Sequence, residues 1–135
     1  MPFYASSEQF YNAMQLLFER LRSGEVNPVD KLAASHLSIR MRFSNPSAEI
    51  AVNGRQKPVT VTYGPSQGRP DLDIEMSTDT FHKILTHEVS LKSAFANRQM
   101  KVLGPIWKTT PLADILTAGR EIYPKILREQ GLQIL

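Results

Sequence analysis

The sequence predicts a single α/β domain over residues 1–135, a five-stranded mixed sheet with helices covering one face. Three observations lead to this fold class. Residues 37–43 alternate apolar and polar side chains without interruption, which predicts a half-buried strand. Residues 71–108 are typical of a strand–helix–helix–strand unit whose elements each have one apolar face. Both ends of the chain repeat apolar residues at helical spacing, which provides helices to cover the sheet.

The first predicted element is a helix that begins after Ser6. Ser6 and Gln9 have the spacing of a capping box, and Ser23-Gly24 is a typical helix end. The apolar residues of this segment lie on one stripe: Phe10, Met14, Leu17 and Leu21. Residues 25–35 contain Asn27-Pro28 and predict a loop with one helical turn rather than a domain boundary.

The next segment predicts three strands. The first covers residues 37–43 and ends at a turn over Asn45-Pro46. A second strand runs through Ile50 and Val52 to Asn53-Gly54, a dipeptide typical of a tight hairpin. The third strand covers residues 59–63, where valines alternate with threonines. Residues 64–70 then form a loop within the domain.

The strand–helix–helix–strand unit begins with alternation over residues 72–76. Ser77 and Ser90 are candidate N-caps for its two helices. Residues 100–102 return to strand periodicity, with Met100 and Val102 facing inward, and Gly104-Pro105 ends the strand. A C-terminal helix begins at Thr110-Pro111. We expect Pro124 to kink or restart it, so this segment is the candidate lid of a binding site.

Residue content excludes several kinds of chemistry. The chain has no cysteine, hence no disulfide, no thiolate nucleophile and no cysteine metal site. His82 and His87 are five residues apart, about 140° around a helix, so they do not share a metal; His36 stands alone. Asp79 lies three residues before His82, but no serine is placed beside them. We therefore expect a protein that binds no metal ion and no cofactor and that is not an enzyme.

Charge and hydropathy limit the partners. The net charge of +3 suits an anionic ligand or a transient contact with a membrane surface, but falls short of the clustered charge of a nucleic-acid binder. The first ten residues lack the basic and apolar regions of a signal peptide, and no apolar run approaches the ~20 residues of a transmembrane helix. We expect a cytoplasmic protein that is a monomer or a weak homodimer.

Three segments in order carry a family resemblance: DLDIEMSTDTFHKIL, SLKSAF and QMKVLGPIWK. Together they resemble the second half of the sterol carrier protein type-2 lipid-binding domain. The resemblance implies the strand order 3-2-1-4-5 and an apolar tunnel between sheet and helices. It also implies non-catalytic binding or transfer of a fatty acid, acyl-CoA, sterol or isoprenoid.

The outward charges agree with that strand order. Arg40 and Arg42 lie on the first strand, and Asp73 and Glu75 lie on the fourth. Opposite charges on neighbouring strands attract by roughly 0.2–1 kcal/mol per pair, which favours placing these strands side by side. The two helices between the fourth and fifth strands lead us to expect a parallel, right-handed crossover there.

The predicted lipid site consists of apolar residues expected to face one interior. Four methionines at inward positions, among them Met41 and Met100, suit an adaptable apolar surface. A solid core is the ordinary alternative, and a scaffold that binds a protein partner is the second function considered. A small hydrolase is disfavoured because no nucleophile–base pair is visible. The candidate site residues are Met41, Phe81, Leu85, Phe95, Met100, Val102, Trp107, Leu112, Ile115, Leu116 and Tyr123.

Overall fold

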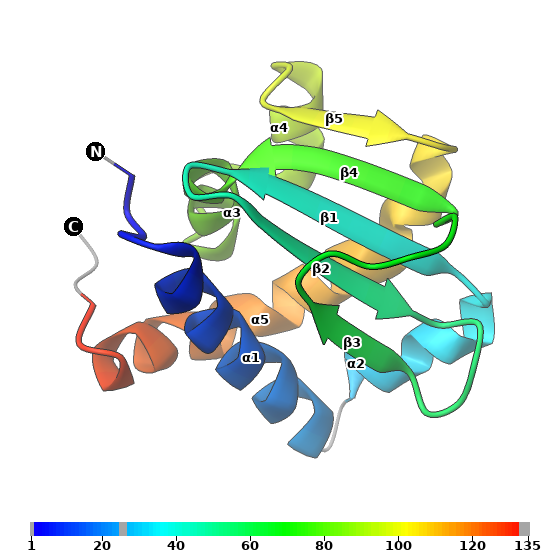
Figure 1. Cartoon of the computed structure of the whole chain (residues 1–135), viewed down its shortest axis with the longest axis horizontal. Helices are drawn as coiled ribbons and strands as arrows, with labels where there is room; N and C mark the ends of the chain where they lie inside the picture. The colour runs from blue at the N-terminus through cyan, green and yellow to red at the C-terminus, as the bar shows by residue number, and fades with distance from the viewer. Residues whose placement is uncertain (1, 25–26, 133–135) are drawn as a thin grey trace.

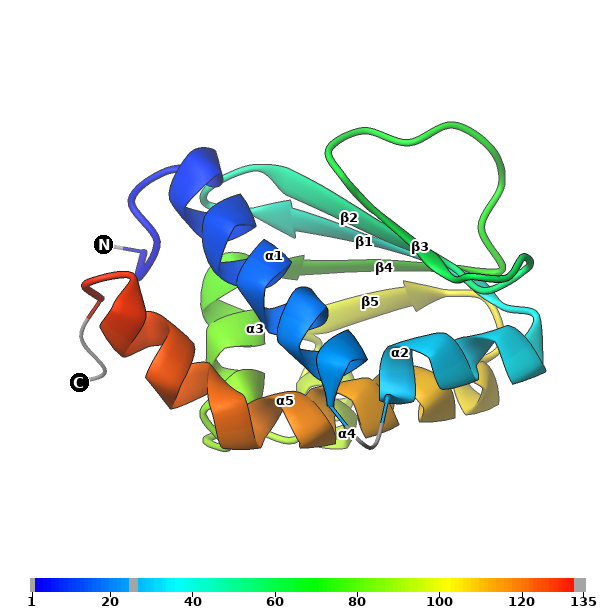
Figure 2. The same ribbon diagram turned by 90° about the horizontal axis from the view of Figure 1, so that it is seen from below.

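The computed structural model describes residues 2–24 and 27–132. Its five strands form one sheet, with α2 and α5 on one side and the loop between β3 and β4 on the other (Figures 1 and 2). In chain order the elements are α1 (Ser7–Ser23), α2 (Pro28–Lys31), η1 (Leu32–Ser35), β1 (Ser38–Ser44), β2 (Ala48–Asn53), β3 (Thr60–Tyr63), β4 (Leu72–Ser77), α3 (Thr78–Leu85), α4 (Leu91–Ala96), β5 (Met100–Leu103), η2 (Ile106–Thr109) and α5 (Thr110–Glu129).

The strand order is β3-β2-β1-β4-β5, which confirms the predicted order. β1 and β4 are parallel, and the β1–β2 and β2–β3 pairs are antiparallel. The prediction of a parallel β4–β5 pair is wrong, because Met76 near the end of β4 pairs with Met100 at the start of β5. The two short helices α3 and α4 connect these strands. The chain leaves the sheet at the C-terminal end of β4 and re-enters it beside the same end, so β5 runs in the opposite direction. A parallel pair needs a crossover that carries the chain back along the whole strand.

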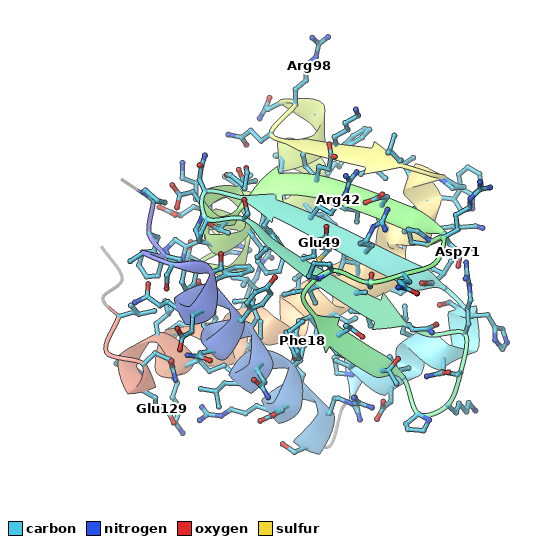
Figure 3. The ribbon with its side chains drawn as sticks, in the orientation of Figure 1. Phe18, Arg42, Glu49, Asp71, Arg98 and Glu129 are labelled. Carbon is cyan, nitrogen blue, oxygen red and sulfur yellow. The ribbon has the colours of Figure 1, made fainter. Side chains whose placement is uncertain are left out.

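The charged face of the sheet is confirmed. Arg40 pairs with Asp73 at 2.6 Å, and Arg42 contacts both Asp73 at 2.9 Å and Glu75 at 2.6 Å. These side chains lie on the face away from the core, where Arg42 is labelled in Figure 3. Because Asp73 accepts hydrogen bonds from two guanidinium groups, its pKa stays below the usual range despite the opposing effect of its burial.

The predicted tight hairpin at Asn53-Gly54 is wrong. Asn53 pairs with Thr60, so a six-residue connection over residues 54–59 separates β2 from β3. Gly54 is required for a different reason: a Cβ there would lie 2.7 Å from the carbonyl oxygen of Leu37 and 2.8 Å from that of Leu32. Its amide donates to the Leu37 oxygen at 2.7 Å. The glycine therefore permits two backbone segments to approach closely.

The predicted helix starts are confirmed at three serines. Ser6, Ser77 and Ser90 each accept a backbone N–H three residues later in the chain. The expected restart at Pro124 is wrong, because α5 continues past it to Glu129. A Cβ on Gly119, which is buried in the same helix, would lie 3.4 Å from side-chain atoms of Leu17 and Leu85. Gly119 therefore allows α1 and α3 to pack closely on α5.

The core lies between the sheet and the helices. Its largest fully buried side chains come from the N-terminal segment, α1, η1, the central strands, α3 and α5. Burial of a large apolar side chain contributes about 1.5–3 kcal/mol, so this layer supplies most of the folding free energy. Among the described residues no helix is long and apolar enough to cross a membrane. Representative core residues are Phe10, Phe18, Ile39, Met41, Ile50, Leu72, Phe81 and Leu127.

Candidate functional site

An apolar groove lies at one edge of the molecule, between α4, β5, η2 and the start of α5. It encloses about 370 Å³, within the usual range of small-molecule pockets. The single charged side chain in its lining is Lys92. We call it the α4–η2 groove, and its main lining residues are Leu91, Lys92, Phe95, Met100, Ile106 and Trp107.

Local sequence explains how the groove forms. Ser90 starts α4 by accepting the amide of Ser93 at 3.0 Å, and the short helix then presents Phe95 at the surface. Gly104 follows β5 with a φ of 124°, and a Cβ there would lie 2.5 Å from the carbonyl oxygen of Asp71. Only glycine fits this position without strain. The resulting bend directs the chain into η2, which carries Trp107.

Two predicted site residues do not face the interior. Trp107 is 73% exposed and Phe95 is 41% exposed, so the prediction of inward-facing side chains is wrong for both. α4 and η2 lie beside the edge strand β5 (Figure 1), where no further layer covers them. The helical spacing of Phe95 resembled that of a core stripe and Trp107 was expected near the site because it follows β5, but the sheet ends before these side chains. Both instead line the α4–η2 groove.

Met100 connects the groove with the core. It is buried and belongs to the core cluster, yet it also lines the groove. Val102, two residues along β5, is partly buried and packs against the same cluster. The structure thus brings together Phe95, Met100 and Trp107 from the predicted set, and adds Leu91 and Ile106. Leu91 starts the α4 stripe, so helical spacing could have found it, whereas Ile106 had no comparable signal.

The remaining predicted site residues lie together in the core. Each is at most 2% exposed and is part of one packed cluster under the sheet. The apolar tunnel expected there is not confirmed, and these side chains belong to the buried core cluster. These residues are Met41, Phe81, Leu85, Leu112, Ile115, Leu116 and Tyr123.

A second apolar hollow of about 510 Å³ lies between α2, η1 and α5. Its lining includes Pro28, Leu32, Pro111 and Ala118, none of which belonged to the predicted site. Two of its lining side chains are charged, Lys31 and Asp114. This hollow is the alternative location for an apolar ligand, and it lies on the opposite side of α5 from Ala113 of the α4–η2 groove.

A buried polar chain runs through the core near the N-terminus. Tyr123 Oη lies 2.6 Å from Tyr4 Oη and 2.6 Å from His82 Nδ1. The ring of His82 stacks on Phe3 with centroids 3.8 Å apart, and the Phe3 amide donates to Asp79 Oδ1 at 2.8 Å. Burial lowers the pKa of His82 and raises the pKa of Tyr4 and of Tyr123. The chain tethers residues 3 and 4 to α3 and α5.

The groove supplies apolar contact rather than reactive groups. Its two hydroxyls serve the backbone: Thr109 Oγ1 donates to the Ile106 oxygen at 2.7 Å, and Thr110 Oγ1 donates to the Trp107 oxygen at 3.2 Å. His82 is part of the buried polar chain, where its ring hydrogen-bonds to Tyr123 rather than facing the groove. Within residues 2–24 and 27–132 no three metal-ligating side chains converge.

Comparison with solved structures places the fold among sterol carrier proteins. The sterol carrier protein domain 2 of Helicoverpa armigera is 16% identical, with 84% of this chain and 89% of that chain covered and a TM-score of 0.64. Sterol carrier protein 2 from Yarrowia lipolytica, in its apo form, is 14% identical, with 78% and 88% covered and a TM-score of 0.62. The ubiquinone synthesis protein UbiJ-SCP2 is 16% identical, with 90% and 97% covered and a TM-score of 0.60.

At these identities the likeness to solved structures concerns the fold. A comparison with curated proteins found no match. Residues 15–117, however, match the model of the SCP-2 sterol transfer family, and this range spans most of the chain from α1 into α5. Family membership and fold together suggest lipid binding or transfer. The chain belongs to the SCP-2 sterol transfer family.

Proposed function

We propose that this protein is a non-catalytic lipid carrier that binds the apolar part of its ligand in the α4–η2 groove. The observation that carries the proposal is the groove's lining, in which two exposed aromatic rings and three aliphatic or thioether side chains surround about 370 Å³. Binding of an acyl chain or ring system removes apolar surface from water on both sides. The family to which the chain belongs suggests the same class of ligand.

The surface groove alone would bind a lipid only weakly. Burial of about six methylenes contributes ~5 kcal/mol, equivalent to a dissociation constant of ~0.2 mM before the costs of ordering. Tighter binding requires the ligand to reach the core. Met100 both lines the groove and belongs to the core cluster. Because methionine is unbranched and flexible, we propose that it moves aside and admits the end of the ligand beneath β5.

Five of the other predicted site residues have a place in this proposal. A chain that passes Met100 would meet Val102 on β5 and then Leu112 and Leu116 on α5, which all belong to or pack against the core cluster. Tyr123 takes part in the buried polar chain. We place it, with Met41, behind the ligand rather than against it.

A second candidate function is that of a scaffold whose interior is filled. Burial of most predicted site residues in the core cluster favours it, because a protein that binds only another protein needs no internal lipid site. In that case the exposed side chains of α4 and η2 would contact the partner protein. The two functions differ in whether a lipid enters the groove in solution.

Two matched substitutions on α5 test the site. Ala113 lines the α4–η2 groove and Ala118 lines the hollow between α2 and α5, and both are partly buried. Titration of a soluble fluorescent fatty acid should show an affinity at least tenfold lower for Ala113→Phe than for the wild type, with Ala118→Phe unchanged. The sole tryptophan, Trp107, should change its emission on binding.

Other outcomes identify the alternatives. If Ala118→Phe blocks binding and Ala113→Phe does not, the ligand occupies the second hollow. If native mass spectrometry of the purified protein finds no lipid and no fatty acid binds to the wild type, the scaffold function is favoured. Both variants must keep the thermal unfolding midpoint of a folded domain, measured by circular dichroism.

A further inference from the structure

The exposed apolar surface of the protein is concentrated at one edge. Among the described residues the four large apolar side chains that are exposed come from α4, β5 and η2. α1 offers no such surface, because its apolar stripe is buried in the core. A monomer rarely exposes apolar side chains together unless they contact something. The four are Phe95, Leu103, Ile106 and Trp107.

The excess positive charge of the chain lies in the same segment. Residues 91–110 contain four basic residues and no aspartate or glutamate. Without these four, the 16 basic residues of the chain fall to 12 against 13 acidic ones, so the net charge of +3 originates here. Arg98 projects outward from the turn between α4 and β5 (Figure 3). The four basic residues are Lys92, Arg98, Lys101 and Lys108.

These cations are not used to hold the fold. None of the ion pairs within the described residues includes any of the four. Lys101 lies opposite Glu75 on β4, but Glu75 pairs with Arg42. Lys108 is near Asp71, whose carboxylate pairs with Arg55. Their charge is therefore available to an external anionic surface.

We propose that this edge docks on anionic lipid bilayers, with Trp107 and Ile106 entering the headgroup region and the four cations contacting lipid headgroups. We call it the docking edge; it consists of the four exposed apolar and four basic residues named above. Tryptophan favours the boundary between water and hydrocarbon because its ring is apolar and its N–H is polar. Apolar insertion and basic charge act as two weak signals, so the contact is reversible.

Docking would place the mouth of the α4–η2 groove against the bilayer, because Phe95, Ile106 and Trp107 belong to both features. A lipid then passes between membrane and groove without crossing water. This inference rests on the proposed function only for the statement that the transferred ligand is a lipid. Docking itself depends on charge and exposed apolar area, and it is measured separately from ligand binding.

Vesicle binding tests the proposal. Large vesicles of phosphatidylcholine alone are compared with equimolar phosphatidylcholine and phosphatidylserine, and the bound protein is measured by co-sedimentation. We expect binding to the anionic vesicles, with a shift of Trp107 emission to shorter wavelength because the ring leaves water. Each cation near an anionic surface is worth about 1 kcal/mol, so replacing all four by glutamine should weaken binding at least ~100-fold.

A control variant separates local contact from net charge. Lys31, Lys57, Lys83 and Lys125 are exposed, lie outside the docking edge and carry the same total charge. Their replacement by glutamine should weaken vesicle binding less than ~10-fold, since charges beyond a Debye length of about 10 Å are screened. The double variant Ile106→Ser and Trp107→Ser should also reduce binding, and it spares the core because both side chains are exposed.

Several outcomes overturn the proposal. Absence of binding to anionic vesicles does so, and a concentration-dependent dimer that Trp107→Ser abolishes would then identify a second copy as the occupant of the edge. Equal losses of vesicle affinity in the two glutamine variants would show that binding depends on the net charge of the protein and not on the docking edge. Normal fatty-acid binding with no vesicle binding refutes docking alone, whereas vesicle binding without fatty-acid binding refutes the proposed carrier function and leaves docking intact.

Discussion

Replacing Tyr123 by phenylalanine removes the hydroxyl at the centre of the buried polar chain. Tyr123 Oη lies 2.6 Å from both His82 Nδ1 and Tyr4 Oη, and when neutral His82 carries its proton on Nε2, Tyr123 Oη donates to Nδ1 and accepts from Tyr4 Oη. Tyr4 and Tyr123 are fully buried, so water cannot replace the lost partner. Phenylalanine keeps the ring and its packing, and therefore the change measures the hydroxyl rather than a cavity.

The magnitude follows from the unsatisfied Tyr4 hydroxyl. A buried donor left without an acceptor costs about 1–3 kcal/mol, and we expect ~2 kcal/mol for Tyr123→Phe. Unfolding entropy is about 2.1 cal/mol/K per residue, or ~0.28 kcal/mol/K for 135 residues. The melting temperature should therefore fall by ~7 °C, which circular dichroism and urea unfolding can both measure.

Two further variants make this prediction refutable. Tyr63→Phe is the control, because Tyr63 is only partly buried and takes no part in the chain. The double variant Tyr4→Phe and Tyr123→Phe should cost less than the sum of the single variants, since it removes both hydroxyls. If Tyr123→Phe stays within ~0.5 kcal/mol of the wild type, the hydroxyl chain does not stabilise the fold.

Two other predictions concern stability. Burial lowers the pKa of His82 below its usual value near 6.5, so the unfolded chain binds a proton more readily, and the stability from neutral His82 is lost as pH falls below ~6.5. The variant His82→Gln should be less pH-dependent than the wild type between pH ~5 and ~7, and identical urea midpoint profiles would contradict this. Gly54→Ala should lower the free energy of unfolding by more than ~3 kcal/mol, because its Cβ would contact two backbone carbonyls. Gly68→Ala should lower it by only ~1 kcal/mol, from its positive φ alone. Equal losses for the two variants in chemical unfolding would refute the close approach at Gly54.

Sequence reasoning succeeded where the determinants are local. A serine that caps a helix acts on an amide three residues away, so Ser6, Ser77 and Ser90 were identified from spacing alone. The neighbouring positions of β1 and β4 were also predictable, because their opposite charges are visible in the sequence. The serine caps lie within one short segment, whereas the charges on β1 and β4 are 33 residues apart but complement each other.

It failed where distant segments decide the structure. The direction of β5 depends on the paths of α3 and α4, which residue periodicity does not describe. Gly54 is needed because Leu32 and Leu37 approach it, and nothing in Asn53-Gly54 reveals those neighbours. The polar chain likewise joins Tyr4 to Tyr123, which are far apart in sequence, and Tyr123 had been assigned to the apolar site for its position on the helix stripe.

The most informative difference concerns Phe95 and Trp107. Both were expected to face the interior, Phe95 because of its helical spacing and Trp107 because of its place after the last strand, yet both are exposed beside the edge strand. Removal of a large aromatic side chain from water is favourable by about 1.5–3 kcal/mol. The exposed rings of Phe95 and Trp107 do not contribute this free energy to folding, and polar side chains would suit a solvent-exposed edge equally well. Positions at which a local pattern and the fold disagree are often functional. The disagreement here coincides with the groove mouth and with the basic segment 91–110, which favours a surface shaped for contact with lipid rather than for folding alone.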